Sequence, residues 1–128
     1  MGFPVIERLL DSVILIDHLN GIEKATQFIL EIEPQQTAIS VITRAEILTG
    51  IEEKDKTKII PLLSQYQLLI VDEPIADLAA ELRREHSWKL PDAFQAAIAQ
   101  QHKIKLTTRN LKDFDPRKHG FVEIPYKL

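Results

Sequence analysis

The stretch Leu9-Leu10-Asp11-Ser12-Val13-Ile14-Leu15-Ile16 contains two apolar runs that meet at a single carboxylate. The run before Asp11 is typical of a short buried strand, and the run after Ser12 favours a helix that Asn20-Gly21 ends. A charge at the end of an apolar strand is costly unless a partner compensates it. The stretch therefore predicts a strand, then a helix, with an acidic side chain at their junction that needs partners.

Apolar runs and periodic segments alternate along the rest of the chain. Further strands are predicted at residues 37–41, 68–71, 104–107 and 121–124. Helices are predicted at residues 22–32, 43–51, 54–66, 72–86 and 90–102, and one helical turn at residues 110–114. This alternation favours an α/β fold with a mainly parallel, four- to five-stranded sheet and helices on both faces.

Length and composition narrow the class of protein. The chain has 128 residues, 45% hydrophobic and 27% charged, which is the balance expected of one globular domain over residues 1–128. It has no cysteine, which excludes disulfide scaffolds, thiolate metal sites and cysteine nucleophiles. No apolar run is long enough for a membrane helix, and the basic start of a signal peptide is missing. We therefore expect a cytoplasmic protein without a membrane partner.

Charge is divided unevenly along the chain. Residues 1–86 hold 8 Lys or Arg against 15 Asp or Glu, whereas residues 87–128 hold 8 against 4. The overall net charge of −3 thus conceals a basic C-terminal third. Four of its basic residues could form a rim that binds a polyanion: Lys89, Lys112, Arg117 and Lys118. We call these four residues the candidate basic rim. Ordinary variation of surface charge is the competing interpretation.

Acidic and amide side chains follow the predicted strands at one edge of the predicted sheet. They are Asp11, Glu46, Asp92, Asn110 and Asp113. In such folds ligands bind outside the carboxyl ends of the strands. Carboxylates gathered in one pocket repel each other unless a hard divalent cation with oxygen ligands neutralises them. The pattern predicts a Mg²⁺ or Mn²⁺ site that could activate water against a phosphoryl group.

Each of these residues also has a purely structural interpretation. Asp92 can stabilise a helix N-terminus, Glu46 can be a solvated helix residue, and Asp113 can cap a turn. Asp17 is interpreted as exposed or as part of a structural hydrogen bond, and assistance to the acidic site is the alternative.

Four segments, in order, resemble the motifs of PIN-domain ribonucleases, and most of all the VapC-type toxins of toxin–antitoxin pairs. The segments are LDSVILID at residues 10–17, SVITRAEI at 40–47, LPDAFQAAIA at 90–99 and TTRNLKDF at 107–114. The resemblance implies an α/β/α sandwich. It also implies Mg²⁺- or Mn²⁺-dependent endonucleolytic cleavage of single-stranded RNA, leaving 5′-phosphate and 3′-hydroxyl ends.

The same resemblance implies roles for individual residues. The implied catalytic residues are Asp11, Glu46, Asp92 and Asp113. The implied cation ligands are Asp11, Glu46 and Asp92, with Asn110 or Asp113 as a fourth. The implied substrate-binding residues are Ser12, Thr108 and Arg109. An ion pair of Arg109 with Asp113 or Asp115 is the alternative to phosphate contact. Val13 departs from the family, which often has asparagine there.

VapC-type toxins form homodimers and are blocked by a small antitoxin that places a basic side chain in the acidic pocket. The resemblance therefore implies a homodimer, a cognate antitoxin and an RNA substrate for this chain. Partner contacts are expected on residues 41–51 and 54–66, including Ile59, Leu62 and Tyr66, and a place in the core is the alternative for these apolar side chains. Trp88 is either an interface anchor or a cover for the helix of Asp92. A catalytically inactive PIN-like scaffold or a receiver-like regulatory module is the alternative.

Overall fold

The computed structural model describes residues 5–128, so the start of the segment that precedes Leu9 lies outside the described residues. Five strands form one sheet, in which every neighbouring pair is parallel. The sheet order is β3-β2-β1-β4-β5. The strands are β1 (Arg8–Leu10), β2 (Thr37–Ser40), β3 (Gln67–Leu69), β4 (Lys105–Thr107) and β5 (Val122–Glu123). The predicted parallel sheet is confirmed.

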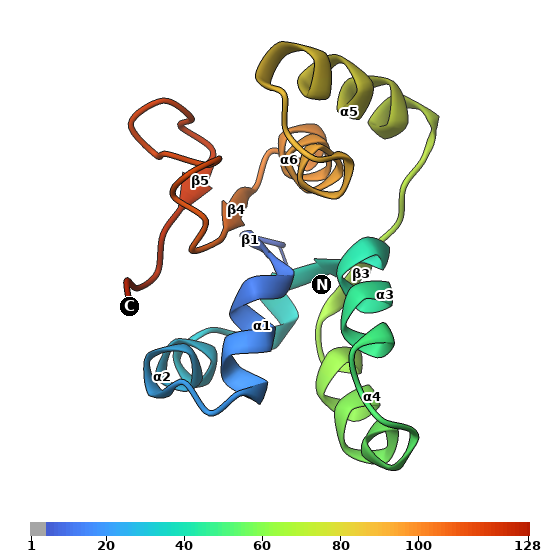
Figure 1. Ribbon diagram of the computed structural model, residues 1–128, viewed down its shortest axis with the longest axis vertical. Helices are drawn as coiled ribbons and strands as arrows, with labels where there is room; N and C mark the ends of the chain where they lie inside the picture. The colour runs from blue at the N-terminus through green and yellow to red at the C-terminus, as the bar shows by residue number, and fades with distance from the viewer. Residues whose placement is uncertain (1–4) are drawn as a thin grey trace.

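Helices cover both faces of this sheet. They are α1 (Ser12–Leu19), α2 (Glu23–Glu31), α3 (Val41–Thr49), α4 (Lys56–Ser64), α5 (Glu73–His86) and α6 (Leu90–His102). Figure 1 shows α5 and α6 on one face and α1 to α4 on the other, which confirms the predicted α/β/α sandwich. No helix within residues 5–128 is both long and apolar enough to cross a bilayer.

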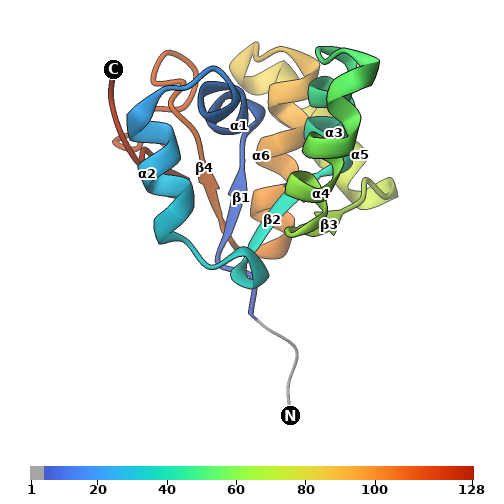
Figure 2. The ribbon, with the colours of Figure 1, turned by 90° about the horizontal axis from the view of Figure 1, so that it is seen from below.

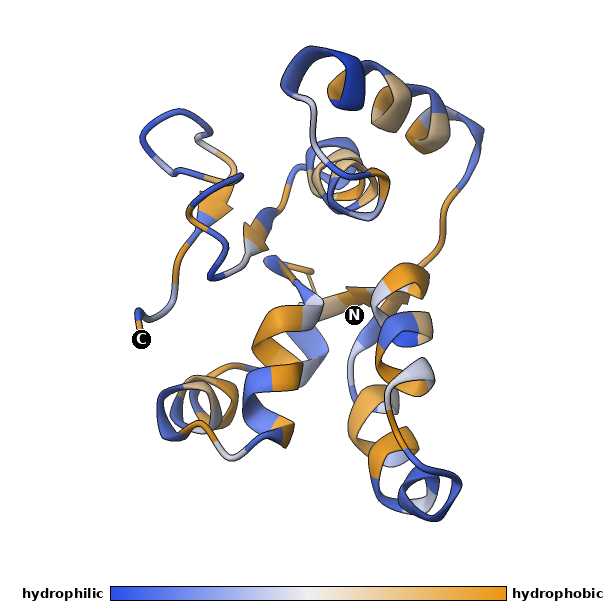
Figure 3. Cartoon of the chain, in the orientation of Figure 1, coloured by the Kyte–Doolittle hydropathy of each residue, from blue (hydrophilic) through white to orange (hydrophobic). Residues whose placement is uncertain are grey.

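The two layers of helices bury two separate cores. Adjacent residues of β1 point to opposite faces, so Leu9 packs on the side of α6 and Leu10 on the side of α1. Small side chains let α6 lie close to the sheet, and four of them are fully buried: Ala93, Ala96, Ala97 and Ala99. Figure 3 shows hydrophilic residues on the outer end of α5 and on the loop between α3 and α4.

The predicted boundary between the second strand and its helix is wrong by two residues. Val41 begins α3 instead of ending β2. The cause is Ser40, whose hydroxyl accepts the N–H of Thr43 at 3.1 Å and so caps the helix at that point.

The region between α3 and α5 also differs from the prediction. The predicted helix over residues 54–66 is a 3-10 turn, Glu53–Asp55, followed by α4, which ends at Ser64. The third strand stops at Leu69, before Ile70, because Leu69 pairs with the last residue of β2. After Ser40, the last residue of β2, the backbone is helical and offers β3 no further hydrogen-bond partner.

The direction of winding reverses at the centre of the sheet. The chain passes from β1 to β2 and β3 on one side, then returns to β4 and β5 on the other. Figure 2 shows β1 and β4 side by side with their carboxyl ends at the same edge. Ligand sites of open α/β sheets lie at such reversals. The predicted acidic residues are therefore expected near the end of β1.

Phe114 anchors the segment after β4. It is fully buried, and its ring centroid lies 4.8 Å from that of Trp88. We expect Phe114→Ala to lower the free energy of unfolding by about 3–5 kcal/mol, because it leaves a cavity beneath this segment. Urea denaturation measures the change. Leu30→Ala, at a residue 78% exposed, is the control, and an equally small loss in both variants would contradict the assignment.

Candidate active site

The carboxyl ends of β1 and β4 open onto a pocket of about 500 Å³. Predicted site residues that line it are Asp11, Ser12, Glu46, Asp92, Arg109 and Asn110. Thr108 and Asp113 do not line it. The fold thus gathers side chains from three helices and one loop, which are far apart in the sequence, into a single acidic pocket.

Asp11 is the most enclosed acid of the pocket, with 7% of its surface exposed. It follows β1 directly and caps α1, where the Ser12 N–H donates to its carboxylate at 2.9 Å. The Thr108 hydroxyl donates at 2.7 Å and the Gln95 side-chain amide at 3.3 Å. These donors are the compensating partners that a buried carboxylate requires.

Asp92 lies in the first turn of α6, after Pro91. Its pKa is raised to about 6, first because packing removes water from its carboxyl group. Neighbouring negative charges raise it further, in the order Asp11, Asp113 and Glu46, while Lys89 acts in the opposite direction. Asp92 therefore carries much of the electrostatic strain of the pocket.

Glu46 reaches the pocket from α3, two turns after the cap at Ser40. Its side chain is exposed at the pocket mouth. The pKa of Glu46 is nonetheless raised, first by partial loss of water around its carboxylate and then by the charge of Asp11. Asp11, Glu46 and Asp92 thus form one interacting group of carboxylates.

The loop after β4 places Asn110 in the pocket wall and Asp113 behind it. The Asn110 side-chain amide donates to the Asp113 carboxylate at 2.9 Å, and the Asp113 N–H donates back to the Asn110 side chain at 3.3 Å. The Trp88 indole N–H donates to the Asp113 carbonyl at 3.1 Å. The predicted helical turn is present here as a turn, closed by the Phe114 N–H on the Asn110 carbonyl at 2.9 Å.

The expected contact of Thr108 with a phosphate is corrected by its burial. Thr108 is 0% exposed, and its hydroxyl donates to Asp11 while accepting the N–H of Asn110 at 3.1 Å. A side chain enclosed in this way positions its neighbours and has no surface for a substrate.

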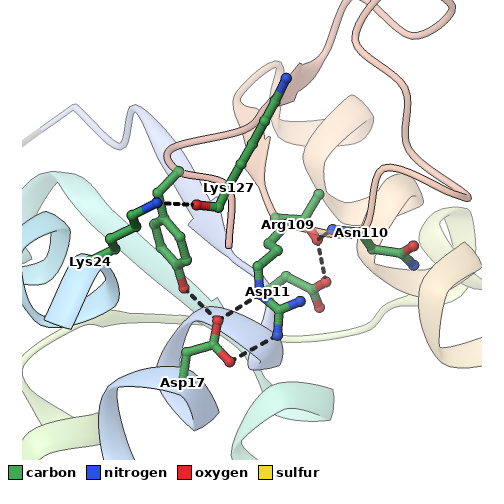
Figure 4. Close-up of polar contacts among 8 residues, drawn as sticks. Asp11, Asp17, Lys24, Arg109, Asn110 and Lys127 are labelled. Atoms are coloured by element: carbon green, nitrogen blue, oxygen red, sulfur yellow. Dashed lines mark hydrogen bonds and ion pairs between the residues drawn. The ribbon is translucent and has the colours of Figure 1, made fainter. Parts of the chain in front are cut away.

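Arg109 forms a different ion pair from the one predicted. Its guanidinium donates to both oxygens of Asp17, at 2.6 and 2.9 Å, and not to Asp113 or Asp115. Figure 4 shows the guanidinium directed at the Asp17 carboxylate. The Tyr126 hydroxyl donates to the same carboxylate at 2.8 Å. Asp17 is therefore buried in a structural network, which confirms its interpretation as part of a structural hydrogen bond.

Gln95 is the residue of the site that sequence reasoning missed. It is 1% exposed and lines the pocket one turn after Asp92 on α6. The available signal was a glutamine inside the run of small and apolar residues from Ala93 to Ala99.

Tyr66 and Trp88, for which the sequence left a partner contact or a buried position open, are both buried in this chain. Tyr66 is 5% exposed and belongs to the core beneath α1. Trp88 is 4% exposed and stacks against His86, with ring centroids 4.2 Å apart. Trp88 therefore packs in the core formed with α6. Its interpretation as an interface anchor is wrong.

The candidate basic rim divides into two parts. Lys112 lines the pocket, and Lys89 is close enough to oppose the raised pKa of Asp92. Arg117 is occupied by Asp115 at 2.9 Å, and Lys118 lines a neighbouring hollow. Two of the four cations are therefore placed to meet an anion at the pocket mouth.

The donor chemistry of the pocket fits a hard divalent cation. Its acidic walls offer carboxylate and amide oxygens and no imidazole. Over residues 5–128, no three His, Cys, Asp or Glu side chains stand close enough to hold an ion as they are placed. The pKa values of Asp92 and Glu46 are raised first by burial and then by neighbouring carboxylates, so a bound cation would be favoured there.

Comparisons with known proteins agree on one family. The sequence profile of the PIN domain matches residues 8–116. "Ribonuclease VapC10" of Mycobacterium tuberculosis is 30% identical over 112 residues, which are 83% of this chain and 84% of the relative.

Solved structures agree with the fold. A "Toxin-antitoxin complex from Klebsiella pneumoniae" contains a chain with 36% identity and a TM-score of 0.87, and the match covers 95% of this chain and 100% of that one. FitAcB from Neisseria gonorrhoeae, at 24% identity, matches with a TM-score of 0.76 over 92% of this chain and 97% of its own. The second likeness concerns the fold alone.

The raised pKa of Asp92 predicts that removing its charge stabilises the fold. The pKa of Asp92 is above its ordinary 3.8, so ionisation of Asp92 costs folding stability as the pH rises from about 4 to 6. We expect Asp92→Asn to stabilise the protein without divalent cations at pH 7.5, on the order of 1 kcal/mol after screening by solvent. The gain should vanish at pH 4. Thermal unfolding in a chelator measures it, and a less stable variant at pH 7.5 would contradict the prediction.

Asp17 predicts the opposite dependence on pH. Hydrogen bonds from Arg109 lower the pKa of Asp17 most, burial opposes them, and the Tyr126 hydroxyl lowers it further. Ionised Asp17 therefore stabilises the fold above its ordinary pKa of 3.8, and this contribution is lost as the pH falls through the lower folded-state pKa. We expect Asp17→Asn to lower the free energy of unfolding by about 1–3 kcal/mol at pH 7. The free energy of unfolding of the variant should also fall less steeply with decreasing pH than that of the wild type.

Asp77→Asn, at an exposed carboxylate on α5, is the control for both substitutions. Urea denaturation between pH 2.5 and 7 gives the two curves. Parallel curves for wild type and Asp17→Asn would refute the linkage.

Proposed function

This chain belongs to the PIN-domain family, and we propose that it is a ribonuclease that acts as the toxin of a toxin–antitoxin pair. The observation that carries the proposal is the acidic pocket at the end of β1, where Asp11, Glu46 and Asp92 meet. Hydrolysis of an RNA phosphodiester requires charge stabilisation at phosphorus and an activated water molecule. A group of oxygen ligands for a hard cation supplies the means for both.

Mg²⁺ or Mn²⁺ is the cofactor that this donor set favours. Asp11, Glu46 and Asp92 would hold it, with Asn110 as the fourth residue and Asp113 orienting the Asn110 amide. When bound, the cation would lower the pKa of water and stabilise charge on the phosphate. We assign the site to these residues because they share one pocket and interact electrostatically.

The chain's own residues orient the substrate. Lys112 and Lys89, at the pocket mouth, would bind phosphates of the RNA on either side of the bond that breaks. Ser12 lines the pocket and is placed to contact the substrate, while Arg109 reaches a phosphate only if its pair with Asp17 opens. Water adds its hydroxyl to phosphorus, and its proton passes to the leaving 3′ oxygen. The products are a 5′-phosphate and a 3′-hydroxyl.

An antitoxin is the partner that the family relationship supports. An acidic pocket attracts a basic side chain by plain electrostatics, so we propose that an antitoxin arginine or lysine enters it. We also propose that the toxin is a homodimer. The competing function is a PIN-like scaffold without catalytic activity. Membership of the PIN family leaves a receiver-like module without support.

Cleavage of RNA tests the proposal. We expect the purified protein, free of antitoxin, to cut a labelled RNA pool in Mn²⁺ into discrete fragments with 5′-phosphate ends. The cleavage rate of Asp92→Asn should be more than about 100-fold lower than that of the wild type. Substituting residues that only support a metal ligand already costs about 10–100-fold in activity, and Asp92 is proposed as a ligand itself. Asp77→Asn should cut like the wild type, and a chelator should stop both.

The remaining outcomes are equally informative. A folded wild type that binds Mn²⁺ but leaves every RNA intact would favour the inactive scaffold. Equal cleavage by wild type and Asp92→Asn would refute the assignment of the site.

A further inference from the structure

We propose that Gln95 is a positioning residue that fixes how the side chains of Asp11, Glu46 and Asp92 are placed relative to one another. The inference deepens the proposed function, since it concerns the same pocket. It rests on one buried amide that is bonded to residues from three separate elements of the fold.

Every polar atom of the Gln95 side chain has a partner. The Ser40 hydroxyl donates to its Oε1 at 2.6 Å. Its Nε2 donates to Thr43 Oγ1 at 2.7 Å and to Asp11 Oδ1 at 3.3 Å. Two N–H groups and one carbonyl oxygen are thus all used, which fixes the orientation of the amide.

These partners are the residues that orient the acids. Ser40 caps α3 and Thr43 lies in its first turn, so both determine how α3 presents Glu46. Asp11 caps α1. Gln95 itself follows Asp92 by one turn on α6, and side chains at this spacing share a helix face. One amide therefore ties together the starts of the three helices that carry Glu46, Asp11 and Asp92.

Packing alone does not require a polar residue here. The other buried residues of α6 are Ala93, Ala96, Ala97, Ile98 and Ala99, all apolar. An apolar side chain of similar length would fill the same space, but the hydroxyls of Ser40 and Thr43 and the carboxylate of Asp11 would each lose a hydrogen-bond partner. A donor to Asp11 is what an apolar residue cannot supply. Glutamate cannot supply it either, because its charge would repel Asp11.

The test replaces the amide while keeping its length. We expect Gln95→Met to fold and to bind Mn²⁺ about 10-fold more weakly or worse, because residues behind metal ligands typically contribute 10–100-fold to affinity. The matched control is Thr37→Val, which removes another fully buried hydroxyl, bonded to the Glu33 carbonyl at 2.8 Å at the opposite end of β2. The control should lower thermal stability but leave the Mn²⁺ affinity within about 2-fold of wild type.

Calorimetric titration with Mn²⁺ and thermal unfolding are measured on the same samples of all three proteins. Weaker Mn²⁺ binding by Gln95→Met alone supports the positioning role. Equal binding by Gln95→Met and wild type overturns that role and leaves the proposed function intact.

A second measurement separates the inference from the proposed function. If the wild type itself bound no Mn²⁺, the proposed cofactor would be wrong, yet the placement of Asp11 could still be examined. A crystal structure of Gln95→Met without metal in which the Asp11 carboxylate has turned away supports the role of Gln95. An Asp11 carboxylate in its original place, with Glu46 and Asp92 unmoved, overturns it.

Discussion

A carboxylate buried at the end of the central strand dictates how the site of this protein is built. Asp11 is 7% exposed, and a charge so enclosed needs hydrogen-bond donors from several directions. Ser12 supplies one from α1, Thr108 one from the segment after β4, and Gln95 one from α6. Because one carboxylate is satisfied from three elements, the ends of β1 and β4 and the start of α6 are brought to the same point.

The pocket built in this way works against the stability of the fold. The pKa of Asp92 rises to about 6, first because its carboxyl group is partly buried and then because like charges gather around it. Functional sites commonly carry such strain, which the rest of the fold must offset. The same repulsion is the reason a divalent cation, or a basic side chain of an inhibitor, would be attracted to the pocket. Cofactor and antitoxin would thus both bind by neutralising the negative charge of the same pocket.

The loop that carries Asn110 is held at both ends. At its start, Arg109 is paired with Asp17 on α1, and Tyr126 bonds the same carboxylate from the C-terminal segment. Lys24 of α2 reaches the carbonyl of Lys127 at 2.6 Å, so this segment is fastened to two helices (Figure 4). At its far end, Phe114 is buried beneath Trp88. Asn110, which lines the pocket, therefore sits on a supported loop.

Apolar runs alternating with periodic segments were sufficient to predict the parallel sheet, its helices on both faces and the acids at its carboxyl edge. Those features follow from local periodicity and from the rule that such edges face one way. Element ends were less predictable, because Ser40 starts a helix through its own side-chain bond and β3 stops where β2 offers no further partner.

Contacts between distant residues could not be derived from the sequence. The pairing of Arg109 with Asp17, the burial of Thr108 and Trp88, and the role of Gln95 each depend on which elements pack side by side. Residue types and spacing determined which chemistry this chain can carry. Tertiary packing alone determines which of those side chains face the pocket and which hold the others in place, since a hydrogen bond needs its two atoms within about 3 Å.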